Sequence, residues 1–482
     1  MKDQKLQGSA TGLGYGLIIF IFLFMAQGFQ PVSSQSASAG GWDRVPALLK
    51  KIVPPRFARR DFSILNYGAK PDSTMDCLPA IKRAIAACHM AGGGRVLIPA
   101  GTHFVKGPIH LKSNVNLHLA RGAVLQFSTD ADDYLPVVLT RFEGMELMNY
   151  SPLIYAYGQH NIAVTGQGIL DGQADNAHWW NWTGSKRFGW KQGMGAQHDP
   201  ENEPALTKMA ARGVPVEKRI FGKGHYMRPT FLEFYHCKNI LIRGITIKNT
   251  PFWVLHPTLS QSITIDSVTT ISYGPNNDGC DPESCQDVLI KNCFFSNGDD
   301  CIAIKSGRNE DGRRINVPSK NIIIENCKMK DGHGGVVIGS ETSGGVENIY
   351  ARDCQMNSPH LDRAIRIKSN ACRGGVLKNF YFRNIEVGQV HEAVFKINMF
   401  YGSEADADCH YPPTLDSVFI DHVVSRKSEY AIYIKGRKDK PVSNITITRC
   451  SFGGVEKENI IQDAQHVKVT NTTINGKPIN ID

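Results

Sequence analysis

Several features that would place the chain in a common functional class are missing from its sequence. The glycine run Gly92-Gly93-Gly94 is not followed by Gly-Lys-Ser/Thr, so it is not a phosphate-binding loop. No Cys-x-x-Cys pair and no cluster of histidine with cysteine occurs, so we expect neither a metal site nor a cofactor. The net charge is +9, but no dense basic run alternates with aromatic residues. We therefore expect an acidic partner other than nucleic acid, unless the surface is merely basic.

A run of apolar residues long enough for a comfortable membrane span is also missing. The N-terminal apolar run extends only from Leu17 to Ala26, follows two lysines, and precedes a small-residue cleavage site at Ala37-Ser38-Ala39. The pattern predicts a signal peptide over residues 1–39, with export to the periplasm or the extracellular space and no stable membrane insertion afterwards. An uncleaved anchor is the alternative. We expect residues 40–60 to be a linker.

Short stretches rich in valine and isoleucine recur along the rest of the chain at a loose spacing of about 20–40 residues. Examples are Ile162-Ala163-Val164, Ile240-Leu241-Ile242, Ile263-Thr264-Ile265 and Ile322-Ile323-Ile324. Their β-branched residues and two-residue alternation favour strands over helices. We predict an all-β fold over residues 61–482, a single-stranded, right-handed parallel β-helix that forms one catalytic domain. An amphipathic helix at Leu78–Met90 is expected to cap its N-terminal end.

The repeat predicts which charged residues meet. Four of its segments end in serine, at Ser284, Ser306, Ser340 and Ser369. Aligning these serines puts Asp278 level with Asp300 and Asp299 level with His333, on strands about 4.8 Å apart. Residues two apart share a face of a strand, so Arg366 and Lys368 point the same way. Asp299 and Asp300 are consecutive and need a bend to share a face, which Gly298 allows.

This convergence has a chemical meaning. Clustered carboxylates cannot all ionise freely, so one of them keeps a proton and can act as an acid. Two cations on one face can bind a substrate carboxylate. Three acids, an imidazole and two cations are sufficient to hydrolyse a glycosidic bond in an acidic polysaccharide. The alternatives without catalysis are turn-capping aspartates, a turn histidine and a solvated strand face.

Two further groups of residues bear on the fold. The cysteines Cys293, Cys327, Cys354 and Cys450 each follow a strand in the same pattern and are predicted to form one buried column. Pairing is left open among Cys77, Cys88, Cys280, Cys301, Cys372 and Cys409. The stretch at residues 173–228 interrupts the repeat as an insertion and contains Trp179, Trp180, Trp182 and Trp190. These tryptophans form either a sugar-stacking wall beside the groove or a hydrophobic plug that holds the insertion down.

Four motifs occur in a fixed order: Asn276-Asn277-Asp278, Asp299-Asp300, Gly332-His333-Gly334 and Arg366-Ile367-Lys368. Together they resemble family 28 of the glycoside hydrolases, the polygalacturonases, over roughly residues 60–470. Asn277 and Gly298 depart from the threonine and glutamine of the endo-acting pattern and resemble the bacterial and exo-acting branches.

The resemblance implies hydrolysis of α-1,4 bonds between galacturonic acid residues of pectin or polygalacturonate, with inversion. By position, Asp299 would be the general acid, tuned by His333, and Asp278 and Asp300 would hold and activate the water. The implied substrate-binding residues are Arg366, Lys368, Asn276 and Tyr401.

Exo action is expected because the insertion at residues 173–228 is placed to close one end of the groove. Three alternatives stay open: a pectate lyase acting by elimination, a related rhamnogalacturonan or xylogalacturonan hydrolase, and a carbohydrate-binding solenoid without activity. We expect the protein to act as a monomer on an acidic polysaccharide.

Overall fold

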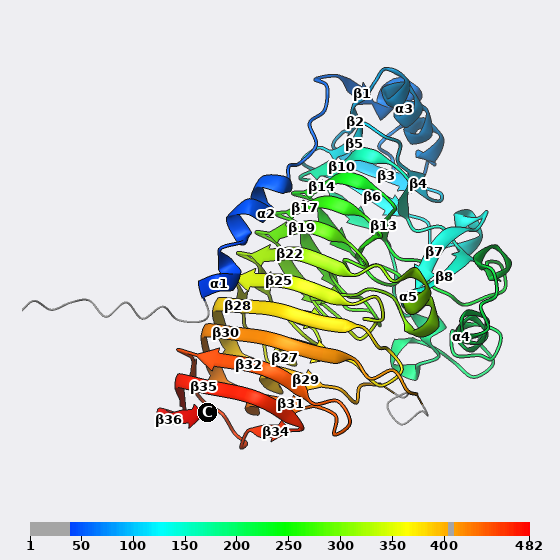
Figure 1. Ribbon diagram of the computed structural model, residues 1–482. Coiled ribbons are helices and arrows are strands. Elements are labelled where there is room, and N and C mark those ends of the chain that lie inside the picture. Colours follow the sequence, from blue (N-terminus) through cyan, green and yellow to red (C-terminus); the bar gives the residue numbers. More distant parts are fainter. Residues whose placement is uncertain (1–38, 403–408) are drawn as a thin grey trace, which may run out of the picture.

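The computed structural model describes residues 39–402 and 409–482, which wind into a right-handed parallel β-helix (Figure 1). The predicted fold class is therefore confirmed. The predicted signal peptide over residues 1–39 lies almost wholly outside the described residues. No helix within the described ranges is both long and apolar enough to cross a membrane.

Each round of the solenoid contributes strands to three faces. The first face consists of β1 (Asp61–Ser63), β2 (Gly94–Ile98), β5 (Val115–Leu119), β10 (His160–Gly166), β14 (Lys238–Arg243), β17 (Gln261–Asp266), β19 (Gln286–Lys291), β22 (Ser319–Glu325), β25 (Val346–Arg352), β28 (Val376–Gln389), β30 (Thr414–Lys427), β32 (Val442–Thr448) and β35 (Ala464–Ile474). The second face consists of β3 (Gly101–Val105), β6 (Ala123–Phe127), β11 (Ile169–Asp171), β15 (Thr246–Lys248), β18 (Thr269–Ser272), β20 (Phe294–Asn297), β23 (Lys328–Met329), β26 (Gln355–Met356), the later parts of β28, β30 and β35, and β33 (Ser451–Phe452).

The third face bears the site described below. Its strands are β4 (Ile109–His110), β9 (Ile154–Tyr157), β13 (Leu232–Tyr235), β16 (Leu255–Thr258), β21 (Ile302–Ile304), β24 (Val336–Ile338), β27 (Arg363–Lys368), β29 (Ala393–Asn398), β31 (Tyr430–Lys435) and β34 (Ile460–Gln462). β36 (Lys477–Ile481) folds back antiparallel on β35 at the C-terminal end. Pairing between successive rounds is otherwise parallel, as in a solenoid.

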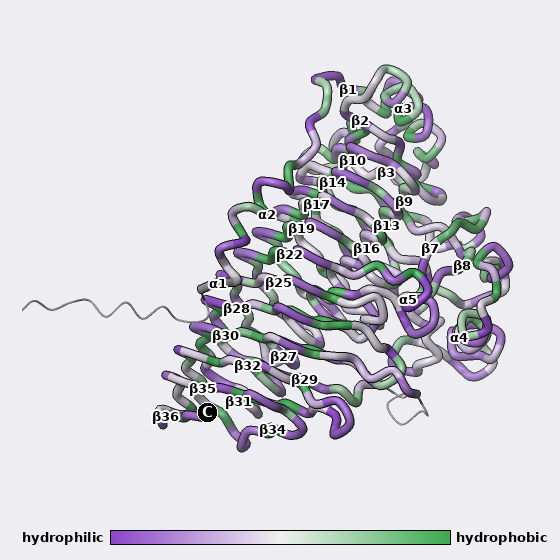
Figure 2. Tube along the Cα trace, viewed as in Figure 1, coloured by the Kyte–Doolittle hydropathy of each residue, from purple (hydrophilic) through white to green (hydrophobic). Residues whose placement is uncertain are grey.

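Side-chain alternation produces the core. In β5 and β6 every second residue is fully buried and the residues between are partly exposed. Figure 2 shows the matching alternation of hydrophobic and hydrophilic segments along the stacked strands. Each apolar side chain packs against its equivalents in the rounds before and after, and the shared interior becomes one continuous cluster along the whole solenoid.

Asparagines mark the corners before the first-face strands. Asn161 donates from its side-chain nitrogen to Asn114 at 3.0 Å, and Asn239 donates to Asn161 at 3.0 Å. All three have positive φ angles, which asparagine tolerates better than most residues. The ladder keeps the corners in register from one round to the next.

The N-terminal capping helix is confirmed. Helix α3 spans Leu78–Met90, as the sequence predicts, and buries Ile81, Ile85 and Cys88 against the first rounds. It follows η1 (Ile64–Tyr67) and covers apolar edges that the open end of the solenoid would otherwise expose.

The expected linker at residues 40–60 is partly helical instead. Helices α1 (Ala39–Trp42) and α2 (Val45–Lys51) run along the outside of the first face (Figure 1). The indole of Trp42 packs edge-on against Tyr350 and lies 3.9 Å from the guanidinium of Arg383. The helices cover apolar side chains on the outer face of β19, β22 and β25, and the division into a linker and a catalytic domain stays a prediction.

The cysteine column is confirmed, although it is interrupted: Cys293, Cys327 and Cys354 stack directly, and Ile385 and Val423 stand between Cys354 and Cys450. The four cysteines of the repeated pattern are buried and free, and so are the remaining described cysteines except for one pair. That pair is a disulfide between Cys372 and Cys409, one of the pairings left open by the sequence.

One group of elements projects from the third face, opposite α1 and α2 (Figure 1). It contains the hairpin of β7 (Val138–Phe142) and β8 (Met145–Asn149), with β12 (Ile220–Phe221) beside β8. The helices in it are α4 (Glu203–Ala211), α5 (Asn309–Ile315), η3 (Trp180–Thr183), η4 (Lys186–Phe188) and η5 (Val216–Lys218). The turn η2 (Ala131–Tyr134) leads into the hairpin.

Trp42→Ala should lower the free energy of unfolding by about 3 kcal/mol, because it empties a buried aromatic contact between α1 and the first face. Urea unfolding followed by circular dichroism measures this loss. Val53→Ala is the matched control, since Val53 lies just beyond α2 and is 59% exposed. A loss no larger than that of the control would show that α1 docks without stabilising the solenoid.

Candidate active site

The outward side of the third face forms the floor of the site. In β27, Ile365 and Ile367 point into the core while Arg366 and Lys368 point to the opposite side. This is the alternation that a strand imposes on consecutive residues. The same alternation in β21 leaves Lys305, just after the strand, on the outward side.

The predicted register between rounds is confirmed. Cys280 pairs with Ile302 and Glu283 pairs with Lys305, an offset that sets Asp278 level with Asp300. Ile302 pairs with Val336, an offset that sets Asp299 level with His333. The backbone nitrogen of His333 donates to the carbonyl oxygen of Asp299 at 3.1 Å.

Glycine is required where the chain bends into the two aspartates. A β-carbon at Gly298 would lie 2.2 Å from the carbonyl oxygen of Gly274 in the preceding round. Only a residue without a side chain allows this approach, and the bend then directs both Asp299 and Asp300 toward the same cluster. The predicted role of Gly298 at the bend agrees with this contact.

The three predicted acids converge. Asp278, Asp299 and Asp300 each present an oxygen within 4.8 Å of the others, and they form the one acidic group of the described ranges with metal-binding spacing. Three cationic side chains already surround them, at Lys305, Arg366 and Lys368. The cluster therefore has its counter-charge within the protein.

The protons are unevenly shared in this cluster. Burial, together with the charge of Asp299, raises the pKa of Asp278 to about 7. Burial would also raise the pKa of Asp299, but the hydrogen bond and the charge of His333 outweigh it and hold that pKa well below its usual range. Nδ1 of His333 lies 2.9 Å from Oδ1 of Asp299, and this hydrogen bond raises the pKa of His333 to about 9. The Asp299–His333 pair thus keeps one proton, held on the imidazole and adjacent to the carboxylate.

Arg366 and Lys368 are engaged within the protein. Lys368 donates to one oxygen of Asp300 at 2.6 Å, and Arg366 donates to the other at 3.2 Å. Asp300 is fully buried and lines neither of the cavities described below. It anchors the two cations from below, whereas Asp278 and Asp299 both face open space.

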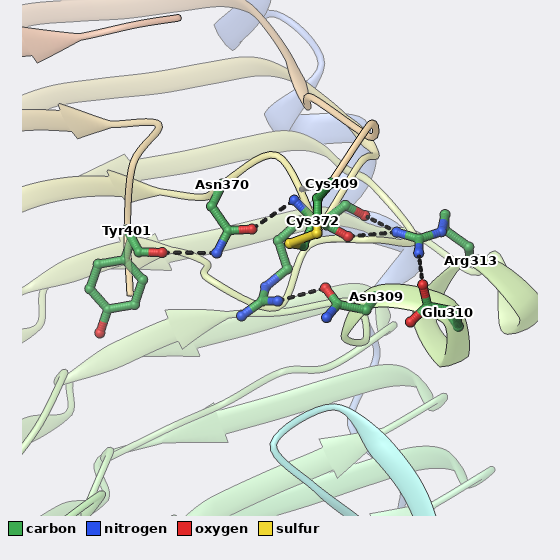
Figure 3. The surroundings of a disulfide bond; sticks show 8 residues. Asn309, Glu310, Arg313, Asn370, Cys372, Tyr401 and Cys409 are labelled. Carbon is green, nitrogen blue, oxygen red and sulfur yellow. Dashed lines mark hydrogen bonds and ion pairs between the residues drawn. A yellow bond between two sulfur atoms is a disulfide. The ribbon is translucent and has the colours of Figure 1, made fainter. Parts of the chain in front are cut away.

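Tyr401 covers the same two cations. Its ring lies 5.1 Å from the guanidinium of Arg366 and 4.8 Å from Nζ of Lys368. Figure 3 shows how the loop that bears it is held: the side chain of Asn370 donates to the carbonyl oxygen of Tyr401 at 2.8 Å and accepts from the backbone of Cys372 at 2.9 Å. The disulfide between Cys372 and Cys409 fixes this corner.

Lys305 is a site residue that the sequence prediction missed. Its Nζ lies 3.0 Å from Glu341 and 3.6 Å from both Asp278 and Asp281. The indole of Trp253 lies 4.4 Å away. A signal was present, because Lys305-Ser306 ends its repeat segment just as Lys368-Ser369 ends a later one.

Two cavities meet at Asp299, of about 410 Å³ and about 740 Å³. Phe188, Pro275, Asn276 and Asp299 line both of them. The first cavity also contains Asp278, Lys305, Lys368, Glu341, Arg373 and Tyr401. The second contains His333, His360, His391, Asp362 and Arg187. Asn276 is held at this junction by Arg228, which donates to its side-chain oxygen at 2.7 Å.

The insertion contributes to the lining of both cavities. Its residues Ser185, Gln197, His198 and Glu203 line the first cavity alone, Arg187 lines the second, and Phe188 lines both. Glu143 of the β7–β8 hairpin and Arg308 also line the first cavity and not the second. Projecting elements, which we call the wall, therefore form more of the first cavity than of the second.

Three of the four tryptophans of the insertion, Trp179, Trp180 and Trp182, form the plug, and none of the four belongs to the wall. Trp179 is 2% exposed and packs against Trp182 and Tyr134. Trp180 donates from Nε1 to the carbonyl oxygen of Thr250 at 2.9 Å. Neither these nor Trp190 lines either cavity. They hold the insertion down while its polar residues form the wall.

Comparison with known proteins identifies the family of the chain. The model of the glycosyl hydrolases family 28 matches residues 218–473, more than half of the chain. The chain belongs to this family. A family model named rhamnogalacturonase A/epimerase, pectate lyase-like, matches residues 62–124.

Three relatives of this family 28 protein carry specific names. A hyperthermoactive exopolygalacturonase from Thermotoga maritima has a crystal structure that is 42% identical, with a TM-score of 0.87, covering 92% of this chain and 97% of that one. A probable polygalacturonase of Vitis vinifera is 29% identical over 81% of this chain and 74% of its own length. An exo-poly-α-D-galacturonosidase of Dickeya chrysanthemi is 26% identical over 85% of this chain and 70% of its own length.

Proposed function

We propose that the protein hydrolyses the α-1,4 bonds of polygalacturonate from a chain end, with inversion at the anomeric carbon. The observation that carries the proposal is that two cavities meet at Asp299 and that the β7–β8 hairpin and the insertion together line one of them. Family membership supports the hydrolysis, and the names of the Thermotoga and Dickeya relatives support exo action.

The orientation of the substrate follows from the carboxylates. Asp278 lines only the first cavity, so the carbon that water attacks lies there. Asp299 lines both cavities. This is the position required of a general acid, because the oxygen that it protonates joins the sugar in one cavity to the sugar in the other. We infer that the wall closes the first cavity, which then takes the terminal sugar at the non-reducing end, while the remainder of the polymer leaves through the second cavity.

Proton transfer is divided between two groups. Asp299 protonates the leaving oxygen with the proton that its pair with His333 retains. Asp278 takes a proton from the attacking water, and its pKa of about 7 suits a general base near neutral pH. The resemblance implied that Asp300 also holds the water, but it is fully buried and lines neither cavity, so we propose instead that it supports the reaction by fixing Arg366 and Lys368.

The cationic floor binds the sugar acid. Lys368 lines the first cavity beside Tyr401, and Arg366 lies next to it on the same strand. A galacturonate carboxylate placed here gains charge-assisted hydrogen bonds. Asn276, at the junction of the cavities, is placed to contact the sugars on both sides of the scissile bond. We further propose that the enzyme is exported through the N-terminal apolar segment and acts as a monomer.

Exo action predicts that galacturonate or a short oligomer of one length is released from the first minutes while the viscosity of polygalacturonate falls slowly. Viscometry in parallel with a reducing-end assay measures both. A steep early fall in viscosity at low conversion would show cleavage within the chain. Products that absorb in the ultraviolet, formed only without a chelator, would show elimination by a lyase instead.

Inversion predicts that the first product carries the β configuration at its new anomeric centre. Proton NMR during the first minutes, before mutarotation, measures it. The two carboxyl groups of inverting enzymes stand about 6.5–9.5 Å apart. In this protein the nearest oxygens of Asp278, Asp299 and Asp300 lie within 4.8 Å of one another, which is a shorter separation. Initial formation of the α anomer would mean that one aspartate acts as a nucleophile.

Asp299→Asn should lower kcat by about a hundred- to ten-thousand-fold without unfolding the protein, because an amide cannot supply the proton. Lys368→Met should mainly raise KM, by about ten- to a hundred-fold, because a charge-assisted contact is lost. Steady-state kinetics on polygalacturonate separates the two effects. Substantial turnover by Asp299→Asn would refute its assignment as the acid.

The pH dependence follows from the two raised pKa values. The value of kcat/KM should rise near pH 7 as Asp278 loses its proton, and fall near pH 9 as the Asp299–His333 pair loses its own. In His333→Gln the alkaline limb should move to lower pH, because Asp299 alone releases its proton sooner. His466→Gln, at an exposed histidine near the C-terminus, is the control. An unmoved limb in His333→Gln would contradict the shared proton.

A further inference from the structure

The closed end of the first cavity contains a second acidic group, which the reaction does not use. Glu143 and Glu203 both approach one guanidinium: Nη1 of Arg308 lies 2.9 Å from Oε2 of Glu143 and 3.1 Å from Oε1 of Glu203. All three line the cavity and keep between 11% and 20% of their side-chain surface exposed. A ligand in the cavity can therefore reach them.

The two glutamates come from separate projections and are held firmly. Glu143 forms the tip of the β7–β8 hairpin, with a φ of 46° that is unusual for a residue other than glycine. The next residue, Gly144, accepts from the backbone nitrogen of Arg308 at 3.1 Å, and a β-carbon there would lie 2.7 Å from that nitrogen. Glu203 begins α4, and His198 of the insertion lies 3.1 Å from its other oxygen.

The hydrogen-bonding groups of this wall differ from those of the floor. Two carboxyl groups face a single guanidinium, and burial next to Glu203 raises the pKa of Glu143 to about 8, so that Glu143 keeps its proton near neutral pH. The guanidinium and the two carboxyl groups therefore offer both donors and acceptors to the hydroxyl groups of a sugar. The cationic floor around Lys368 is where the carboxylate goes. The two regions together orient a sugar acid with its hydroxyl edge toward the wall.

We propose that Glu143 and Glu203 bind the free C4 hydroxyl group at the non-reducing end of a saturated galacturonate chain. This rests on the proposed function, which puts the terminal sugar in the closed cavity. The C4 oxygen distinguishes a chain end from an interior residue, because in an interior residue it is part of the next glycosidic bond. The pair therefore selects ends that carry this hydroxyl group and discriminates against ends that lack it, such as the 4,5-unsaturated ends that eliminative cleavage leaves.

The test compares two substrates of equal length, saturated trigalacturonate and 4,5-unsaturated trigalacturonate, using purified enzyme. For the wild type, kcat/KM for the saturated substrate should be at least about ten-fold higher than for the unsaturated substrate. The unsaturated substrate lacks the C4 hydroxyl group and so loses a charge-assisted hydrogen bond. Glu203→Ala and Glu143→Ala should each lower kcat/KM for the saturated substrate while leaving the unsaturated substrate nearly unchanged. The ratio between the substrates then falls toward one.

The ratio separates hydroxyl recognition from general damage. The unsaturated ring also differs in shape, but a variant of the wall changes the ratio only if the wall contacts the missing hydroxyl group. Glu201→Ala is the matched control, because Glu201 is an exposed acid of the same insertion and lines neither cavity. Its ratio should equal that of the wild type.

Each outcome has a distinct meaning. A wild type that cleaves both substrates equally, or variants that lower both rates by the same factor, would overturn the role of the wall while leaving hydrolysis of polygalacturonate intact. A wild type that hydrolyses neither saturated trigalacturonate nor polygalacturonate would overturn the proposed function and this inference with it. A collapse of the ratio in both variants, with correct folding by circular dichroism, supports the assignment.

Discussion

The buried ion pairs of Asp300 with Lys368 and Arg366 join two rounds of the solenoid at the site. A carboxylate with no exposure to water is costly unless it is paired and hydrogen-bonded, and both of its oxygens are satisfied here. The rounds that carry these residues stack at a fixed spacing. Because Asp299 is the neighbour of Asp300 in the chain, the pairing also holds the backbone from which Asp299 projects. The arrangement of the remaining charges follows from this fixed base.

A single strand register accounts for the division of labour among the acids. Successive rounds set Asp278 level with Asp300 and Asp299 level with His333, and the bend at Gly298 exposes one aspartate while it buries its neighbour. The exposed carboxylate gains an imidazole that retains a proton, and the carboxylate without such a partner has a raised pKa. Identical chemical groups thus acquire an acidic and a basic role from their surroundings.

Rigid elements outside the repeat decide which polymer can enter. The β7–β8 hairpin, the insertion and α5 all project from the third face, and the buried tryptophans fix the insertion in place. Since none of these elements belongs to the stacked rounds, they can vary without disturbing the core. The stacked rounds carry the acidic cluster, and the projections carry the wall to which we assign the choice between a chain end and a chain interior.

The sequence by itself determined the solenoid, its capping helix at Leu78–Met90 and the convergence of the three aspartates. Side-chain alternation and round-to-round stacking are local rules that can be read directly from residue order. Only the tertiary structure decided that α1 and α2 form and pack on the first face, that Cys372 pairs with Cys409, and that Glu143 meets Glu203 at Arg308. These contacts join segments of unrelated pattern far apart in the chain, and no periodicity relates them. They depend on which surfaces the finished fold leaves uncovered.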